Sequence, residues 1–171
     1  GIMATYAETE KLKTKLRDKT YREAVRLIEK TNRCAVIRPT GFGKTGILTR
    51  FISDGQYKNI LYLYPSKPVK DAVIHFYYGH NDVDTIPGVT FMTYQKVATM
   101  SAKERESKHS SYDLIIADEC HKLGGNKRSH GMSRLLEKNK NVHFVGATAT
   151  PERLDLIDEI GLFFDDNTCF D

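Results

Sequence analysis

Two short segments of this chain carry residues suited to the hydrolysis of a nucleotide. One is the glycine-containing run Thr40-Gly41-Phe42-Gly43-Lys44-Thr45, and the other is the acidic run Asp118-Glu119-Cys120-His121. A glycine-rich loop ahead of a helix presents backbone N–H groups to phosphate oxygens. Adjacent carboxylates can bind a magnesium ion and orient a water molecule. Together the two segments predict a site that binds and hydrolyses a nucleoside triphosphate.

The glycine-containing run has the features of a phosphate-binding loop. Gly41 and Gly43 allow the backbone to approach an anion closely. We expect Lys44 to reach the β- and γ-phosphates and the Thr45 hydroxyl to bind Mg²⁺. Arg38 occupies the position at which the usual spacing has its first glycine. The alternative is a tight strand-to-helix turn with an exposed lysine. The predicted nucleotide contacts are Thr40, Gly41, Phe42, Gly43, Lys44 and Thr45.

The acidic run follows an apolar stretch, residues 114–117, that is typical of a buried strand. We expect Asp118 to bind Mg²⁺ and Glu119 to orient or deprotonate the attacking water. His121 has no metal-like spacing to other histidines or cysteines, so we expect it to link the nucleotide site to the threonine-rich segment at 148–150. The alternative is a solvated acidic turn. The residues predicted to act in catalysis are Lys44, Asp118, Glu119 and His121.

Alternating apolar and helical patterns predict the elements that must position these residues. Continuous apolar runs predict strands at 34–38, 59–64, 88–93, 112–117 and 142–147. Helical patterns lie at 21–30, 44–53, 68–77, 94–102 and 129–138. This alternation predicts an α/β fold with a parallel sheet and helices on both faces. Both segments then lie at the edge formed by the carboxyl ends of the strands, where such sheets bind ligands.

Length and overall composition limit the kinds of protein that this chain can be. The 171 residues suit one domain, and 40% hydrophobic with 28% charged residues predict a globular chain. A net charge of +4 is compatible with nucleic-acid binding but does not require it. The three cysteines form no metal-like pair, which favours a reducing, cytoplasmic location. No apolar stretch approaches the ~18 residues of a membrane span.

These motifs resemble the first RecA-like domain of superfamily-2 helicases and translocases. Residues 39–45 match motif I, residues 118–121 a DExH-type motif II, and residues 146–151 motif III. The continuation Glu152-Arg153 is similar to the translocating subunits of type III and type I restriction enzymes. The resemblance implies a P-loop NTPase fold. It also implies that residues 1–171 form a single N-terminal ATP-binding domain, with a second RecA-like domain outside this sequence.

The resemblance also assigns roles to further residues. Motifs Ia and Ib imply contacts to the nucleic-acid backbone from Ser66, Lys67, Thr93, Tyr94 and Gln95. Motif III implies that Thr148 and Thr150 couple the nucleotide state to nucleic acid. Tyr21 takes the place at which relatives carry a glutamine that reads adenine, so it is expected to stack on or pack beside the base.

The implied function is that of an ATP- and Mg²⁺-dependent motor domain acting on nucleic acid. The restriction-type similarity at Glu152 and Arg153 favours DNA over RNA. The second RecA-like domain is the expected partner and the expected source of catalytic arginines, so the isolated domain should be weakly active. The alternatives are a nucleotide-switched nucleic-acid-binding module that unwinds nothing, an RNA helicase domain and a P-loop phosphotransferase.

Overall fold

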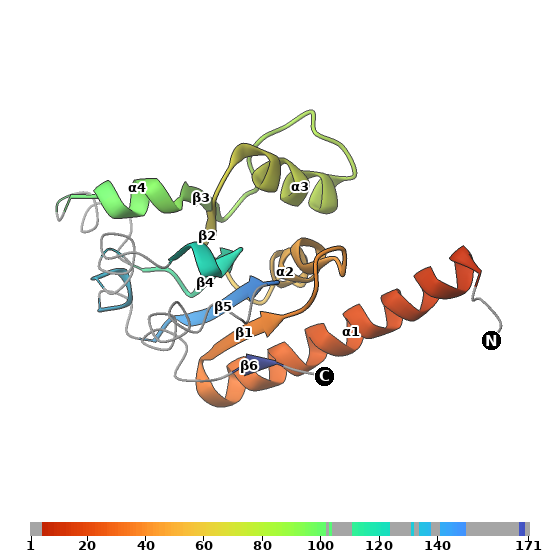
Figure 1. The fold of residues 1–171 in the computed structure, drawn as a ribbon. Helices are drawn as coiled ribbons and strands as arrows, with labels where there is room; N and C mark the ends of the chain where they lie inside the picture. Colours follow the sequence, from red (N-terminus) through yellow and green to blue (C-terminus); the bar gives the residue numbers. More distant parts are fainter. Residues whose placement is uncertain are drawn as a thin grey trace.

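A computed structural model describes residues 5–101, 103, 111–123, 131, 134–137, 141–149 and 168–169 of the chain. Its centre is a six-stranded sheet of order β3-β2-β4-β5-β1-β6, and the chain alternates between strands and helices (Figure 1). The strands are β1 (Arg33–Ile37), β2 (Ile60–Tyr64), β3 (Val89–Thr93), β4 (Leu114–Asp118), β5 (His143–Thr148) and β6 (Thr168–Cys169). The helices are α1 (Tyr6–Thr31), α2 (Lys44–Ser53), α3 (Lys67–Tyr78), α4 (Tyr94–Thr99) and the 3₁₀ turn η1 (Cys120–Leu123).

All strand pairs are parallel, which confirms the predicted fold class. The five predicted strands appear within about two residues of their expected bounds, because continuous runs of apolar residues suit strands that are covered on both faces. Strand β4 is buried along its whole length. The sixth strand, β6, was not predicted. It has only two residues, Thr168 and Cys169, and carries no apolar pattern.

Two apolar cores cover the two faces of the sheet. Helices α1, α2 and α3 pack on one face, where Tyr62, Ile116 and Val145 point from the strands. Helix α4 and the turn η1 cover the opposite face, where Leu61, Ile115 and Phe144 point. This arrangement confirms the expected helices on both faces. Of the helix predicted at 129–138, residues 131 and 134–137 are helical, and the others lie outside the described residues.

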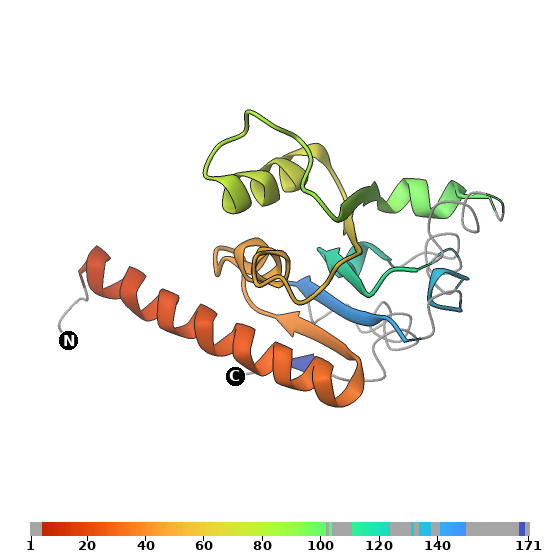
Figure 2. The ribbon, with the colours of Figure 1, turned by 180° about the vertical axis from the view of Figure 1, so that it is seen from behind.

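Helix α1 starts fifteen residues earlier than the predicted 21–30 segment. A capping box begins it: the Thr5 side chain accepts from the Glu8 N–H, and the Glu8 carboxylate accepts from the Thr5 N–H. Its N-terminal half projects past the strands in both views (Figures 1 and 2). The sequence did not predict this half as a helix, because its residues are mostly charged or polar and show no clear helical spacing of apolar residues. Among the described helices, including the 26 residues of α1, none is long and apolar enough to cross a membrane.

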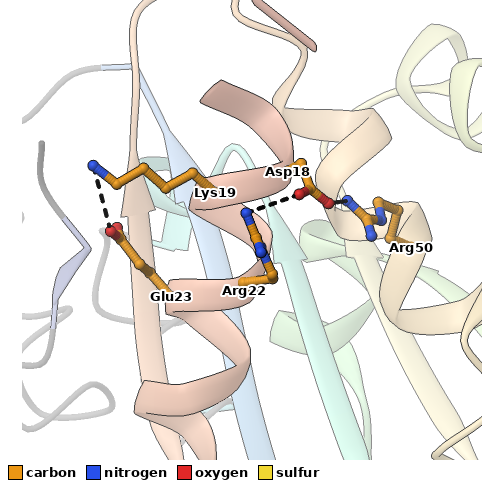
Figure 3. A network of polar contacts seen from close by, with 5 residues as sticks. All are labelled: Asp18, Lys19, Arg22, Glu23 and Arg50. Atoms are coloured by element: carbon orange, nitrogen blue, oxygen red, sulfur yellow. Dashed lines mark hydrogen bonds and ion pairs between the residues drawn. The ribbon is translucent and has the colours of Figure 1, made fainter. Parts of the chain in front are cut away.

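A polar network ties α1 to α2 (Figure 3). Asp18 accepts from Arg22 on its own helix and from Arg50 on α2, at 3.0 Å each. The Arg50 guanidinium lies 4.0 Å from the centre of the Tyr21 ring, and the Tyr21 hydroxyl donates to Asp54. Partly exposed ion pairs stabilise a fold only weakly. The network's consequence is geometric, because it holds the middle of α1 beside the C-terminal end of α2.

Candidate active site

The phosphate-type loop connects β1 to α2. Gly41 and Gly43 have φ angles of +85° and +97°, a region that other residues rarely adopt, and Gly43 is the N-cap of α2. The Lys44 ammonium donates to the backbone carbonyls of Arg38 and Pro39, at 3.0 Å each. Burial lowers the pKa of Lys44, and the charges of Asp118 and Glu119 oppose that shift. The loop therefore holds a cation at the N-terminal end of a helix, beside two carboxylates.

The structure accommodates Arg38 where the usual loop has glycine. The Arg38 side chain is 3% exposed and donates to the Ile37 carbonyl. Its guanidinium carbon lies 5.7 Å from the centre of the Phe42 ring. The long side chain is thus turned into the protein, and the backbone angles of the following glycines stay available for the loop.

Arg17 of α1 contacts the loop, and the sequence had not predicted a role for it in the site. Its Nε donates to the Phe42 carbonyl at 2.6 Å. A Cβ atom placed on Gly43 would lie 2.7 Å from the same nitrogen. A glycine is therefore required at 43 both for the backbone angle and for the approach of Arg17. The signal that could have found this residue is the capping box at Thr5, which starts a helix long enough to include Arg17.

Gly43→Ala is expected to destabilise the fold by about 1 kcal/mol, because an alanine is strained at this φ. It is also expected to weaken nucleotide binding, because the new methyl group displaces Arg17 and shifts the Phe42 carbonyl. Urea unfolding measures the first effect, and titration with a fluorescent nucleotide measures the second.

Gly55→Ala is the matched control for that substitution. Gly55 also has a positive φ, +69°, but nothing lies within 4 Å of the position of its Cβ. It should lose similar stability and keep nucleotide affinity. Equal affinity in the two variants would contradict a role of Arg17 in shaping the loop.

Asp118 ends β4 as a buried carboxylate, 2% exposed. Its Oδ2 accepts from the Thr45 hydroxyl at 3.0 Å and from the Tyr62 hydroxyl at 2.9 Å. Burial raises the pKa of Asp118, and the hydrogen bonds from Tyr62 and Thr45 oppose that shift. Burial also raises the pKa of Tyr62 well above its usual value, so the phenol keeps its proton. The structure thus joins the two predicted magnesium ligands, Thr45 and Asp118, in one hydrogen-bonded cluster.

Glu119 follows in an unusual backbone conformation, with a φ of +51°. The peptide that precedes it is held by the Tyr94 hydroxyl, which donates to the Asp118 carbonyl at 2.6 Å. Tyr62 and Tyr94 reach Asp118 from opposite faces of the sheet, since each belongs to a different core. The sequence did not assign either tyrosine to the site, because their hydroxyls meet Asp118 only after strands and helices pack.

A cavity of about 340 Å³ lies between the loop and the acidic run. It brings together most of the residues predicted for nucleotide binding and catalysis. The predicted residues that line it are Thr40, Gly41, Gly43, Lys44, Thr45, Asp118, Glu119 and His121. Tyr21 lines neither this cavity nor a neighbouring one of about 510 Å³ between α1, α2 and Phe76. The Tyr21 ring is 6% exposed and packs against Phe51, so the structure places it in the core.

His121 makes the contact that the sequence predicted. Its Nδ1 and the Thr148 hydroxyl share a hydrogen bond of 2.8 Å, which joins the acidic run to the end of β5. The coupling role of Thr148 stays a prediction. Thr150, the other predicted coupling residue, lies outside the described residues.

Of the residues predicted to contact nucleic acid, some are exposed and others have structural contacts within the domain. Ser66, Lys67 and Gln95 are exposed at the starts of α3 and α4. The Thr93 hydroxyl accepts from the Lys96 N–H and caps α4. Tyr94 is 2% exposed, so its ring does not reach the surface, and the structure assigns it to the support of Asp118.

The model of the family described as "Type III restriction enzyme, res subunit" matches residues 4–153. The chain belongs to this family. Consistent with membership, the chain is 27% identical to the DNA 3'-5' translocase XPB2 of Sulfurisphaera tokodaii, over 84% of the chain. It spans only 33% of that relative's length.

Solved helicase structures share the fold of this family member. The Pyrococcus furiosus Hef helicase domain superposes with a TM-score of 0.66 and 19% identity, covering 90% of this chain and 36% of that one. The Sulfolobus solfataricus SWI2/SNF2 ATPase core in complex with dsDNA gives a TM-score of 0.61 and 14% identity, covering 88% and 35%. With the family match, these similarities show that the chain has the RecA-like fold found in superfamily-2 helicases and translocases.

Proposed function

We propose that this domain binds and hydrolyses ATP to drive translocation of the full-length protein along DNA. The observation that carries the proposal is one cavity holding a loop lysine, Lys44, a buried carboxylate, Asp118, and a second carboxylate, Glu119. In this proposal the loop N–H groups and Lys44 bind the phosphates. Glu119 orients the water that attacks the γ-phosphate and takes up its proton.

Thr45 and Asp118 form a donor set that fits Mg²⁺. Both offer oxygen atoms, which this hard cation prefers. Their side chains already lie within hydrogen-bond distance, and the Thr45 oxygen keeps a lone pair while its proton faces Asp118. When bound, Mg²⁺ would neutralise charge that develops on the phosphate oxygens. Tyr62 supports the pair by holding the Asp118 oxygen that Thr45 also contacts.

Tyr62→Phe is expected to raise the Mg²⁺ concentration needed for half-maximal turnover by about ten-fold. The ring still fills the core, but the Asp118 carboxylate loses one of its two hydroxyl donors. The measurement is phosphate release in the full-length protein against Mg²⁺ concentration at saturating ATP.

Tyr57→Phe is the matched control, because the Tyr57 hydroxyl contacts His143 at 2.9 Å, at the start of β5 and away from the cavity. It should leave the Mg²⁺ dependence unchanged. A Tyr62→Phe protein with the Mg²⁺ dependence of the wild type would contradict the supporting role of this hydroxyl.

We also propose that a second RecA-like domain of the same protein completes the site. The chain's share of the matched relative, 33%, leaves room for such a domain. A partner domain would supply positive charge to the transition state, and loss of such an arginine can cost about 10³- to 10⁵-fold in rate. Residues 1–171 alone should therefore bind nucleotide weakly and turn it over slowly. Rapid, nucleic-acid-stimulated turnover by the isolated domain would contradict this.

DNA is the favoured substrate because the similar protein from Sulfurisphaera tokodaii is a DNA translocase and the family takes its description from a restriction enzyme subunit. The test is phosphate release by the full-length protein with linear duplex DNA, with single-stranded RNA and without nucleic acid. Duplex DNA should stimulate turnover most. Stimulation by RNA alone would support the RNA helicase alternative. Nucleotide binding without turnover would support a nucleotide-switched binding module, and transfer of phosphate to a small acceptor would support a phosphotransferase.

A further inference from the structure

Tyr94 lies between an exposed helix start and the predicted catalytic carboxylate. It is the first residue of α4, directly after Thr93 and directly before the exposed Gln95. Tyr94 is 2% exposed and belongs to the core cluster that also contains Val97 and Cys120. At the far end of the ring, the hydroxyl donates to the Asp118 carbonyl at 2.6 Å. One rigid side chain therefore connects the start of α4 to the end of β4.

The peptide that Tyr94 holds is the one that aims Glu119. The Asp118 carbonyl and the Glu119 N–H belong to the same planar unit. Glu119 has a φ of +51°, which costs energy for a residue with a side chain and persists only when its surroundings hold it. The hydrogen bond from Tyr94 is such a constraint. A displacement of α4 would therefore turn this peptide and move the Glu119 carboxylate within the cavity.

We propose that Tyr94 is a positioning residue that transmits nucleic-acid contact at the start of α4 to Glu119. The inference rests on the proposed function, since it requires both a nucleic-acid surface at Gln95 and a catalytic role of Glu119. It differs from the predicted link through His121 and Thr148, which joins the acidic run to β5. The path through Tyr94 instead starts at α4, beside the edge strand β3.

The experiment compares full-length wild type and Tyr94→Phe in phosphate release as linear duplex DNA is titrated. Phenylalanine keeps the ring in the core and removes only the hydroxyl. The ratio of stimulated to basal turnover is expected to fall about ten-fold, the factor that corresponds to the loss of one well-formed hydrogen bond. The DNA concentration at half-maximal stimulation should stay within about two-fold, because the ring does not reach the surface.

Two further variants separate this effect from simpler ones. Gln95→Ala, on the exposed side of the same helix, should raise the half-maximal DNA concentration and keep the maximal stimulation. Tyr57→Phe removes a hydroxyl group whose hydrogen bond, to His143, lies away from the cavity, and this variant should behave as wild type. Thermal unfolding of each variant checks that the fold is intact.

An unchanged ratio of stimulated to basal turnover in Tyr94→Phe overturns the proposal, including the case in which both rates fall together. A loss of DNA affinity in this variant also overturns it, because Tyr94 would then act at the surface. Failure of the proposed function is visible separately. It appears as a wild-type protein whose turnover does not respond to DNA or RNA, and in that case no coupling exists for Tyr94 to transmit.

Discussion

Glu119→Gln should lower ATP turnover by about a thousand-fold, the range measured for the loss of a positioned general base. Glutamine has the same shape and keeps one acceptor oxygen, but it cannot take a proton from the attacking water. The structure supports a specific effect because Glu119 lines the cavity next to Lys44 and Thr45. Steady-state phosphate release in the full-length protein measures the change, and a titration with a fluorescent nucleotide should show affinity within about two-fold of wild type.

The matched control for that variant is Glu29→Gln on the exposed surface of α1. It removes the same charge and should leave turnover unchanged. A Glu119→Gln protein with wild-type turnover would remove Glu119 from the mechanism and favour the nucleotide-switch alternative. Loss of nucleotide binding in this variant would place Glu119 among the residues that hold the loop.

Lys44→Ala should lower turnover by at least about a hundred-fold, the scale of removing one preorganised donor from developing charge. The physical reason differs from that for Glu119, because the Lys44 ammonium is the only lysine or arginine side chain among the described residues that line the cavity. Burial already lowers the pKa of Lys44, which reflects incomplete solvation of its charge. A phosphate group would offer this ammonium charged oxygen acceptors in addition to the carbonyls of Arg38 and Pro39. Nucleotide affinity should therefore fall together with turnover.

Lys30→Ala, at the exposed end of α1, is the control for a lost lysine. It should bind nucleotide as wild type does. The two site variants are informative together: Glu119→Gln should separate binding from turnover, whereas Lys44→Ala should lower both. Normal nucleotide affinity in Lys44→Ala would contradict the assignment of residues 40–45 as a phosphate loop.

Much of the site was predictable because its residues are close in sequence. Residues 40–45 form a loop by themselves: two glycines supply the positive φ angles, and the helix that follows supplies the N–H groups. The acidic run was equally local, since four buried residues lead directly to Asp118. The parallel sheet then brought both segments to one edge, as the alternation of strands and helices predicts.

The supports of the site were not predictable in the same way. Arg17 meets Phe42, and Tyr62 and Tyr94 meet Asp118, across separations of 25, 56 and 24 residues. In the sequence, Tyr62 is one apolar residue of a buried strand, and Tyr94 belongs to a motif expected to touch nucleic acid. Whether a phenol faces the surface or the core depends on packing around it, and packing has no short-range sequence signal.

Tyr21 is the opposite case, a residue that the sequence assigned to the site and that the structure places in the core. Its position along the chain predicted a place beside a base, but the Asp18–Arg50 network and the Phe51 ring hold it in the core. The sequence by itself therefore determined the fold class and the residues with reactive groups, because glycines, carboxylates and apolar runs act through local geometry. Only the tertiary structure decided which side chains hold those groups in place, because hydrogen bonds between distant segments form only when the two faces of the sheet are packed.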